Sequence, residues 1–335
     1  MRIRNSIRVV DTHGCGHTCR VAIGGIPTLY GTTVEEKMND MKENHDHIRR
    51  MLICEPRGYH GTYGAVIVDA TTPEADFGVF FMETANYVPY SGVNSIAVGK
   101  GMIEVGIVKA VEPVTKVVME TCLGLVTLEY KVEHGHVLEG TVKNMPCFLL
   151  QKDVKIDLPD VGEIEVDICF GGAFYAMVNV DDLGLQVGRA NIDELIHIQP
   201  KVTAAVKAVT KVKHPVSGFD IFTNVIFYQN PKNEGEVYKH VDIYGVKEWD
   251  RSPCGTGTSA RMAQLYARGK MGLNEEVIFE GATGTQLRGV ILEETEVGGQ
   301  PAVLPQFTGK ASVIGLNNLI LEEDDVIDGG IIHNV

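Results

Sequence analysis

A chain of 335 residues, 44% of them hydrophobic, is long enough for two folded domains, and its formal net charge is −14. This acidic balance excludes the basic face that a nucleic-acid partner requires. No apolar run approaches the roughly 20 residues of a membrane span, and no apolar stretch typical of a signal peptide follows the N-terminus, so neither membrane insertion nor secretion is expected.

The seven cysteines are scattered along the chain, with no spacing typical of a disulfide framework. We therefore expect reduced thiols and a cytoplasmic location. His13, Cys15, His17 and Cys19 alternate along the chain and are potential metal ligands. On one strand, however, all four would face the same side with neighbours about 6.6 Å apart, whereas zinc requires ligands arranged around it. We expect these residues to line a strand or pocket, and we expect no metal.

Apolar periodicity and turn residues predict the elements of the first half. In chain order we expect strands at 7–11 and 19–23, a charged helix at 34–51, strands at 63–69 and 75–82, a helix that follows 91–95 and runs to about 105, and strands at 116–120 and 125–132. The expected N-cap of the charged helix is Thr32 or Thr33, because acidic residues follow in its first turn.

The second half predicts the same order of elements. We expect strands at 165–169 and 174–180, a helix at 192–211, strands at 219–227 and 238–244, a helix that ends at Gly269, strands at 276–280 and 286–293, and a strand-rich tail at 303–321. The halves also match in spacing, since Ser91-Gly92 aligns with Cys254-Gly255, and Gly106 and Gly269 each follow fifteen residues later. Such an ordered series indicates two copies of one α/β unit.

The repeat predicts two lobes. We place the first lobe, which carries Ser91, at residues 1–128 plus 310–335, and the second lobe, which carries Cys254, at residues 129–309. Two similar lobes that face each other would point two helix N-termini at one cleft. Ser91 would then lie on one side of this cleft and Cys254 on the other.

A thiol stands at a predicted helix start in the segment 250–260, which reads Asp-Arg-Ser-Pro-Cys-Gly-Thr-Gly-Thr-Ser-Ala. Pro253 restricts the backbone before Cys254, and the glycines allow a tight turn that exposes amides. We expect Thr258 or Ser259 to cap the helix. The helix N-terminus favours a thiolate, so we expect the pKa of Cys254 to be lowered. A buried structural cysteine in a helix-entry turn is the alternative.

Two proton-transfer groups on opposite faces of a substrate carbon suit inversion of its configuration, because one group removes the α-proton and the other returns one. Asp250, four residues before Cys254, is suited to hold a cationic amine. No pyridoxal cofactor is required by this chemistry. The substrate carboxylate would be held by backbone amides at the two helix starts, those of Gly92, Val93, Gly255 and Thr256.

The segment 250–258 resembles the second active-site motif of the proline racemase family, which includes hydroxyproline 2-epimerases and trans-3-hydroxy-L-proline dehydratases. Residues 11–13 (Asp-Thr-His), 55–58 (Glu-Pro-Arg-Gly) and 170–172 (Phe-Gly-Gly) are similar to further signatures of this family. The resemblance covers nearly the whole chain. It implies an α+β fold of two pseudo-symmetric lobes like that of diaminopimelate epimerase, each a mixed or antiparallel sheet wrapped around a central helix.

The resemblance also implies catalysis without a cofactor, a homodimer, and specific roles in the site. Cys254 would be one acid/base and Asp250 would contact the substrate nitrogen. Two segments differ from the family pattern. Residues 90–93 read Tyr-Ser-Gly-Val where the family has Met-Cys-Gly-His, so Ser91 replaces a cysteine and Val93 a histidine. His17-Thr18 stands where the family has Glu-Pro.

We therefore expect a cofactor-independent racemase or 2-epimerase of proline or hydroxyproline, with Ser91 and Cys254 as opposed acid/base groups. A trans-3-hydroxy-L-proline dehydratase is the alternative, since a hydroxyl is a weaker acid than a thiol and elimination needs only one strong base. A non-catalytic binding protein descended from a racemase is a further alternative, against which the intact 250–258 segment argues. A thiol hydrolase is less favoured, because no histidine is assigned to Cys254 by local sequence.

Overall fold

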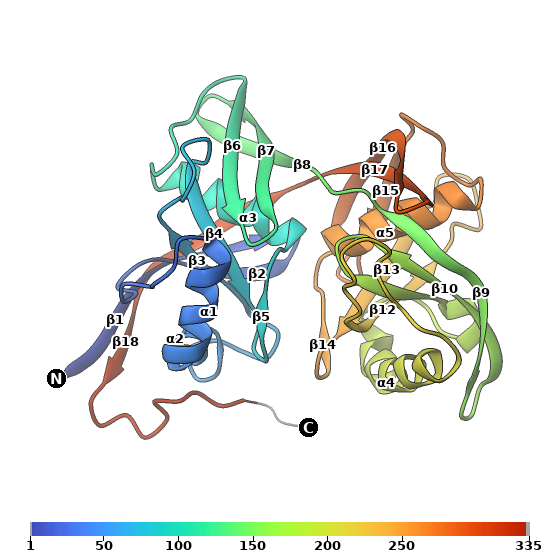
Figure 1. The fold of residues 1–335 in the computed structure, drawn as a ribbon, viewed down its shortest axis with the longest axis horizontal. Helices are drawn as coiled ribbons and strands as arrows, with labels where there is room; N and C mark the ends of the chain where they lie inside the picture. The colour runs from blue at the N-terminus through green and yellow to red at the C-terminus, as the bar shows by residue number, and fades with distance from the viewer. Residues whose placement is uncertain (1, 333–335) are drawn as a thin grey trace. The chain divides into compact units, whose positions relative to one another are not determined.

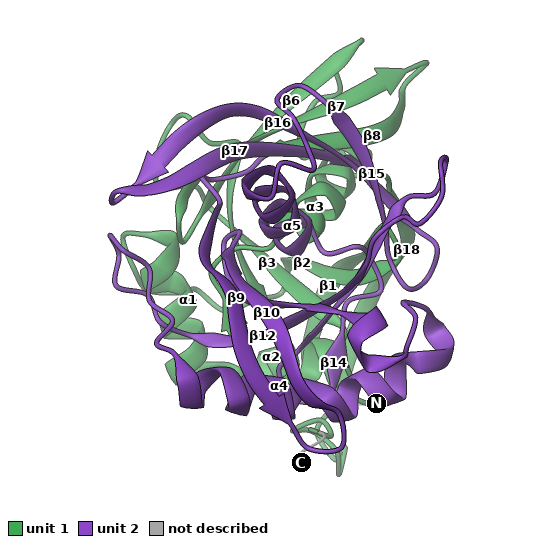
Figure 2. Cartoon of the chain, turned by 90° about the vertical axis from the view of Figure 1, so that its right-hand side faces the viewer, with its two compact units in different colours: residues 1–142, 310–335 green, residues 143–309 purple. Residues whose placement is uncertain are grey.

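The computed structural model describes residues 2–332 and divides the chain into two compact units (Figures 1 and 2). The first unit comprises residues 1–142 and 310–335, and the second comprises residues 143–309. A division between residues 128 and 129 would cut strand β7 (Gly124–Glu133). Because β7 forms an antiparallel hairpin with β8 (His136–Lys143), the first unit extends to Val142.

The first unit is a mixed sheet around helix α3 (Gly92–Glu104), which contacts β1, β2, β7 and β18. Antiparallel pairs join β18 to β1, β1 to β2, β3 to β4, β4 to β5, and β6 through β7 to β8, whereas β2–β3 and β4–β6 are parallel. The remaining bounds are β1 (Ile3–Gly14), β2 (His17–Gly24), α1 (Val34–Asn44), α2 (Asp46–Ile53), β3 (Tyr63–Val68), β4 (Phe77–Met82), β5 (Tyr87–Val88), β6 (Val114–Thr121) and β18 (Ala311–Glu322).

The second unit is built in the same way around α5 (Gly255–Ala267), which Figure 2 shows encircled by strands. Antiparallel pairs join β9 to β10, β10 to β11, β12 to β13, β13 to β14, and β15 through β16 to β17, whereas β11–β12 and β13–β15 are parallel. The other bounds are β9 (Phe148–Leu158), β10 (Gly162–Phe170), β11 (Phe174–Asn179), α4 (Ile192–Val209), β12 (Phe222–Gln229), β13 (Tyr238–Tyr244), β14 (Glu248–Trp249), β15 (Glu276–Glu280), β16 (Gln286–Val297) and β17 (Gln300–Gly309).

The two units share one order of elements and pairings. Each has an antiparallel hairpin, a helical crossover to a parallel strand, an antiparallel partner strand, a strand of two residues and then a helix of 13 residues. The α+β prediction, with a mixed sheet around a central helix in each half, is confirmed. The charged helix differs from its prediction, since it is broken at His45 into α1 and α2. Thr33 caps α1 by accepting from the amide of Glu36 at 3.1 Å.

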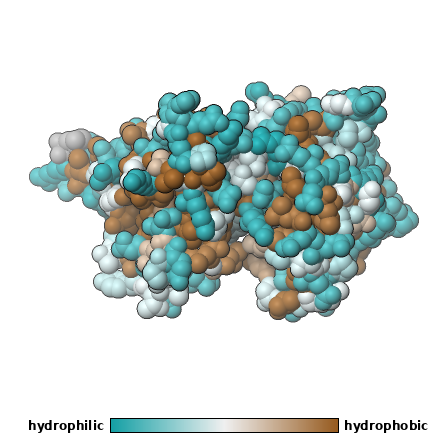
Figure 3. All heavy atoms as spheres, turned by 90° about the horizontal axis from the view of Figure 1, so that it is seen from above, coloured by the Kyte–Doolittle hydropathy of each residue, from teal (hydrophilic) through white to brown (hydrophobic). Residues whose placement is uncertain are grey.

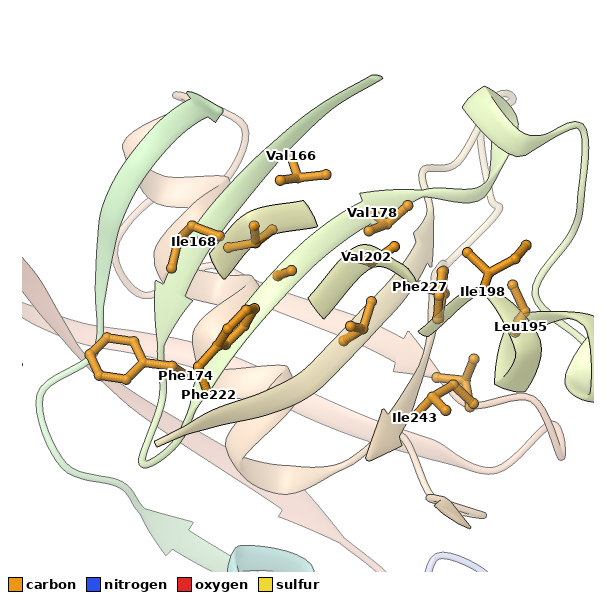
Figure 4. Packing of buried hydrophobic residues seen from close by; sticks show 14 of the residues in the cluster. Val166, Ile168, Phe174, Val178, Leu195, Ile198, Val202, Phe222, Phe227 and Ile243 are labelled. Carbon is orange, nitrogen blue, oxygen red and sulfur yellow. The ribbon is translucent and has the colours of Figure 1, made fainter. Parts of the chain in front are cut away.

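The strands β10 to β13 carry side chains alternately to two helices, as strand geometry requires. One face packs on α4, and Figure 4 shows Val178 and Phe227 of the strands beside Ile198 and Val202 of this helix. The opposite face packs on α5, where Ala260 joins a second cluster of strand residues, namely Cys169, Tyr175, Met177 and Ile226. Alternate residues along these strands therefore face α5, and the residues between them face α4.

Asp167 of β10 ties α5 to the sheet. It is 1% exposed and accepts from Gln264 at 2.6 Å, from Arg268 Nε at 2.7 Å and from the amide of Asp153 at 3.0 Å. Burial alone raises the pKa of Asp167, but these hydrogen bonds and the Arg268 charge outweigh burial and hold the pKa below its usual range. The ionised carboxylate thus stabilises the fold above its usual pKa, and this contribution is lost as the pH falls through the lowered value.

Replacing Asp167 with asparagine is expected to lower the free energy of unfolding by about 2–4 kcal/mol at pH 7, because it leaves Arg268 without its buried partner. The difference from the unsubstituted protein should begin to shrink as the pH falls below about 4, where the unfolded carboxylate becomes protonated, and it should be smallest once the pH is also below the lowered pKa of the folded carboxylate. Thermal denaturation at pH 7, 5, 4 and 3 measures it. Asp160→Asn is the control, since its side chain is 88% exposed. A deficit that is the same at every pH would contradict this assignment.

Hydrophilic residues cover much of the face drawn in Figure 3, with hydrophobic residues scattered between them. Within residues 2–332, no helix is both long and apolar enough to cross a membrane.

Candidate active site

Cys254 is the N-cap of α5, which begins at Gly255. Its Sγ accepts a hydrogen bond from the amide of Gly257 at 3.3 Å. The expectation that Thr258 or Ser259 caps this helix is wrong, because both lie inside its first turns. The hydroxyl of Thr258 donates to the Pro253 carbonyl at 3.1 Å, and that of Ser259 donates to the Gly255 carbonyl at 2.9 Å.

The backbone of Cys254 lies at φ +62° and ψ +110°, a conformation that residues with a Cβ rarely adopt. The preceding segment holds it there. The amide of Cys254 donates to Ser252 Oγ at 3.0 Å, and Ser252 donates from both its amide and its hydroxyl to Asp250 Oδ1 at 2.7 Å. Asp250 therefore orders the turn that presents the thiol, and such enforced strain is common at functional sites.

Groups from three elements surround the Cys254 thiol, which is 6% exposed. Sγ lies 3.4 Å from Asp242 Oδ2 of β13, 3.6 Å from Thr256 Oγ1 and 3.8 Å from the Tyr175 hydroxyl of β11. The Tyr175 and Thr256 hydroxyls are in turn 2.6 Å apart. The thiol thus lies against polar groups rather than in an apolar core, which argues against a purely structural cysteine.

The expected lowering of the Cys254 pKa is wrong. Burial, followed by the negative charges of Asp242 and Asp250, raises the pKa of Cys254 well above its usual range. The hydrogen bonds from the Gly257 amide and from Thr256 act in the opposite direction but are outweighed. The helix start alone favours a thiolate, whereas the carboxylates that the fold brings to it favour the neutral thiol.

Asp242 belongs to this site, and so does Tyr175, although neither is predicted from the sequence. The signal for Asp242 is the alternation along β13, where Val241 and Ile243 face the α4 core and Asp242 faces α5. The carboxylate is 2% exposed and also accepts from Asn224 Nδ2 at 3.3 Å. An acidic residue between two apolar ones on a buried strand, just before the motif at 250–260, marks a polar position facing the site.

Ser91 occupies the equivalent position in the first unit, as the N-cap of α3. Its backbone is extended at φ −143° and ψ +117°, unlike that of Cys254. Ser91 Oγ accepts from Asn94 Nδ2 at 2.9 Å, and its carbonyl accepts from the amide of Ser95 at 2.9 Å and its hydroxyl at 2.7 Å. Ser91 is therefore held by neutral donors of its own helix, whereas two carboxylates lie near Cys254.

Each unit has a helix that starts at the positions expected to bind the substrate carboxylate. The first-turn amides of a helix have no acceptor within the helix and carry its positive dipole end, so they suit a carboxylate. The structure groups Gly92 and Val93 with Ser91 in the first unit. In the second unit it groups Gly255 and Thr256 with Cys254 and Asp250.

Gly171, in the Phe-Gly-Gly motif, allows the turn between β10 and β11 to contact the first turn of α5. A Cβ at this position would lie 2.2 Å from the Thr256 carbonyl oxygen and 2.7 Å from the Ala260 amide nitrogen. These are backbone atoms of the helix, so a side chain at 171 would displace the turn that carries Thr256.

Gly171→Ala is expected to lower the free energy of unfolding by about 1–3 kcal/mol, because the added methyl overpacks the helix start. Gly188→Ala is the matched control, because a Cβ there meets nothing within 4 Å and its φ of 171° is extended. Urea denaturation of the two variants tests the claim, with a fall in stability for Gly171→Ala alone as the expected result. Equal stabilities would show that the close approach does not constrain α5.

The alternating His and Cys residues at 13–19, and Arg57, lie in the first unit. The turn at Cys15-Gly16 separates His13 on β1 from His17 on β2, so the alternating residues are not on one strand. The described part of the chain, residues 2–332, contains no group of three or more His, Cys, Asp or Glu side chains placed to hold a metal ion. Arg57 donates from Nε to the Ile320 carbonyl at 3.1 Å and pairs with Asp325, and so anchors its loop.

Comparison with known proteins identifies the motifs as part of a chain-wide similarity. A family model described as proline racemase matches residues 9–332. The chain is 36% identical to the proline racemase of Clostridioides difficile, over 99% of both chains. It is 34% identical to the trans-3-hydroxy-L-proline dehydratase of Burkholderia ambifaria, over 98% of this chain and 99% of that protein. A hydroxyproline epimerase from Agrobacterium vitis, solved with bound trans-4-hydroxy-L-proline, has a TM-score of 0.89 at 29% identity, covering 99% of this chain and 97% of that one.

Proposed function

Because this chain belongs to the proline racemase family, we propose that it is a cofactor-independent racemase or 2-epimerase of proline or a hydroxyproline. The observation that carries the proposal is the pair of residues at equivalent helix starts, Ser91 on α3 and Cys254 on α5, each followed by first-turn amides. The relatives named as a racemase and an epimerase act, by their names, on this class of imino acid.

In the proposed reaction, Cys254 and Ser91 exchange protons with opposite faces of the substrate α-carbon. Removal of the α-proton by the Cys254 thiolate leaves an electron pair that delocalises into the substrate carboxylate. The amides of Gly255 and Thr256, with those of Gly92 and Val93, stabilise this developing charge. Return of a proton from the Ser91 hydroxyl completes inversion, and the reverse sequence converts the other isomer.

Asp250 is proposed to bind the protonated ring nitrogen of the substrate. Its Oδ1 orders the turn through Ser252, while the carboxylate as a whole brings negative charge next to Cys254. A bound ammonium group would offset that charge and make the thiolate easier to form. Binding and activation of the base would thus be coupled.

The alternative function is dehydration of trans-3-hydroxy-L-proline, and the surroundings of Ser91 favour it. Ser91 Oγ is hydrogen-bonded to the neutral amide of Asn94 rather than to a base. In elimination, the Cys254 thiolate removes the α-proton, the C–O bond at the β-carbon breaks as the α,β-double bond forms, and the new thiol returns its proton to the departing hydroxyl to give water, so Ser91 need not become an anion. The dehydratase of Burkholderia ambifaria shows that the family includes this activity.

Incubation in D2O with the isomers of proline, 3-hydroxyproline and 4-hydroxyproline distinguishes the two functions. Epimerisation yields a diastereomer or enantiomer that carries deuterium at the α-carbon and has lost no water. Dehydration yields an unsaturated imino acid that lacks one water. Mass spectrometry with chiral chromatography separates these products. The absence of α-deuteration and of water loss with all of these compounds would rule out both functions.

The assembly and the location are further parts of the proposal. We infer a homodimer, as the family resemblance implies, and a cytoplasmic location, as the scattered cysteines without a disulfide pattern indicate. Light scattering on the purified protein should then give twice the 36.6 kDa of a single chain. A monomeric mass at micromolar concentration would contradict the dimer.

A further inference from the structure

A carboxylate lies directly against the thiol of the second unit. Asp242 Oδ2 is 3.4 Å from Cys254 Sγ, with the thiol placed to donate, and both side chains are more than nine-tenths buried. Asn224, on the neighbouring strand β12, donates to the same oxygen at 3.3 Å. Oδ2 of this carboxylate therefore accepts from Asn224 and from the thiol itself.

Asp242 is a buried acid beside an apolar cluster. The hydrophobic residues Cys169, Met177, Ile226 and Ala260 pack together on the α5-facing side of this sheet. Burying a carboxylate among such residues costs stability compared with an apolar side chain of similar size. A valine at 242 would satisfy the strand and the packing, so neither requires the acid.

We propose that Asp242 is a positioning residue for Cys254: its carboxylate accepts a hydrogen bond from the thiol, orients the S–H bond, and so determines the pH at which Cys254 becomes a base. This inference rests on the proposed function and adds to it a residue outside the motif at 250–260. Asp242 acts through Cys254, by orienting and stabilising the protonated thiol.

The titratable groups around Cys254 support this role. Asp242 approaches from β13, Asp250 from the loop before α5, and Tyr175 from β11. The two carboxylates raise the pKa of Cys254 after burial, and burial likewise raises the pKa of Tyr175, which stays neutral. His240 of β13 contacts the Pro253 carbonyl, and burial lowers its pKa to about 3, so it adds no positive charge near neutral pH.

The chemical consequence is that the Cys254 thiolate forms only at higher pH but is then a strong base. A thiolate that forms only at higher pH binds a proton more tightly, which favours removal of the weakly acidic α-proton. In that step the S–H bond forms as the α-C–H bond breaks, and the electron pair of the C–H bond remains on the substrate. Asp242 then accepts a hydrogen bond from the new thiol and stabilises the protonated form.

Alkylation of Cys254 tests the inference without any substrate, because the thiolate is the reactive form. The rate of modification by iodoacetamide is measured against pH, and the modified peptide is identified by mass spectrometry, since the chain has six other free cysteines. Asp242→Asn keeps the shape of the side chain and removes its charge. Asp242→Val is the second variant, because an apolar side chain suits a buried strand in case the buried asparagine amide prevents folding. Either variant should shift the alkylation midpoint by at least one pH unit downward, which is about a tenfold faster reaction at pH values below both midpoints.

Tyr175→Phe is the matched control, because it removes a hydroxyl 3.8 Å from the same sulfur without changing charge. A midpoint that Asp242→Asn and Asp242→Val leave unchanged would overturn the inference. So would a shift of equal size in Tyr175→Phe, because the effect would then follow from any lost polar contact rather than from the carboxylate.

The pH profile of α-deuteration links the thiol to the reaction. For the Asp242 variants, we expect the acidic limb of the kcat/KM profile to move to lower pH, because the Cys254 thiolate forms at lower pH. The plateau value of kcat/KM should fall, because this thiolate is a weaker base. A purely structural role would lower the rate at every pH and leave the limb in place, which would refute the inference. If no imino acid is deuterated, the proposed function fails, whereas the alkylation midpoints still decide the role of Asp242.

Discussion

Cys254→Ser is expected to lower the rate of α-deuteration at least about 1,000-fold, which is the loss typical of removing a general base. Serine preserves the size of the side chain and an acceptor for the Gly257 amide, which the Sγ of Cys254 contacts at 3.3 Å. It removes the group that ionises, because in the same surroundings a hydroxyl is a far weaker acid than a thiol. Exchange of substrate α-protons in D2O, followed by mass spectrometry, measures the effect.

Cys122→Ser is the control for this substitution, because Cys122 is a partly buried thiol outside the motif at 250–260. It should keep its activity within a few-fold. Undiminished deuteration by Cys254→Ser would show that another group removes the proton, and the assignment of the second unit's helix start as the reactive site would then be wrong.

Substitution of Ser91 is expected to reduce formation of the inverted isomer, whereas removal of the α-proton by Cys254 continues. Ser91→Ala should lower formation of the inverted isomer about 100-fold or more, since the second face loses its proton donor. Deuteration with retained configuration should continue through Cys254. Ser91→Cys should raise inversion above the unsubstituted level, because a thiol donates and accepts protons more readily than a hydroxyl.

Chiral chromatography of each product separates inversion from simple exchange. Asn94→Ala is a useful companion, because it removes the donor to Ser91 Oγ at 2.9 Å but leaves the hydroxyl. If Ser91→Ala leaves water loss from trans-3-hydroxy-L-proline intact while abolishing inversion, elimination is the reaction that needs only Cys254. Unchanged inversion in Ser91→Ala would exclude Ser91 as the opposing group.

The thiol shows how local reasoning and tertiary structure can disagree. From the segment at 250–260, a cysteine at a helix start predicts a lowered pKa, and the helix start is confirmed. The pKa is nevertheless raised rather than lowered, because the site is buried and because Asp242, on a strand 12 residues earlier, places a negative charge beside the thiol. Local sequence shows the dipole and the turn, but not the dielectric surroundings or charges from other elements.

Features that depend on neighbours along the chain could be predicted from the amino-acid order. Alternation and periodicity predicted most strands and the central helices, since a strand repeats every two residues and a helix every 3.6. Matched spacings identified the repeat, and Ser91 and Cys254 are indeed the N-caps of corresponding helices. The motif residues carried the resemblance to the family, to which the chain belongs.

The surroundings of these residues could not be predicted in this way, because they come from distant parts of the chain. Asp242 and Tyr175 reach Cys254 from strands that lie 12 and 79 residues away in sequence, and Asp167 reaches Arg268 across 101 residues. The first unit extends through the β7–β8 hairpin, because pairing between strands places that boundary. The physical reason is common to all three. Hydrogen bonds, burial and charge act through space, so they depend on which distant strands the fold brings together.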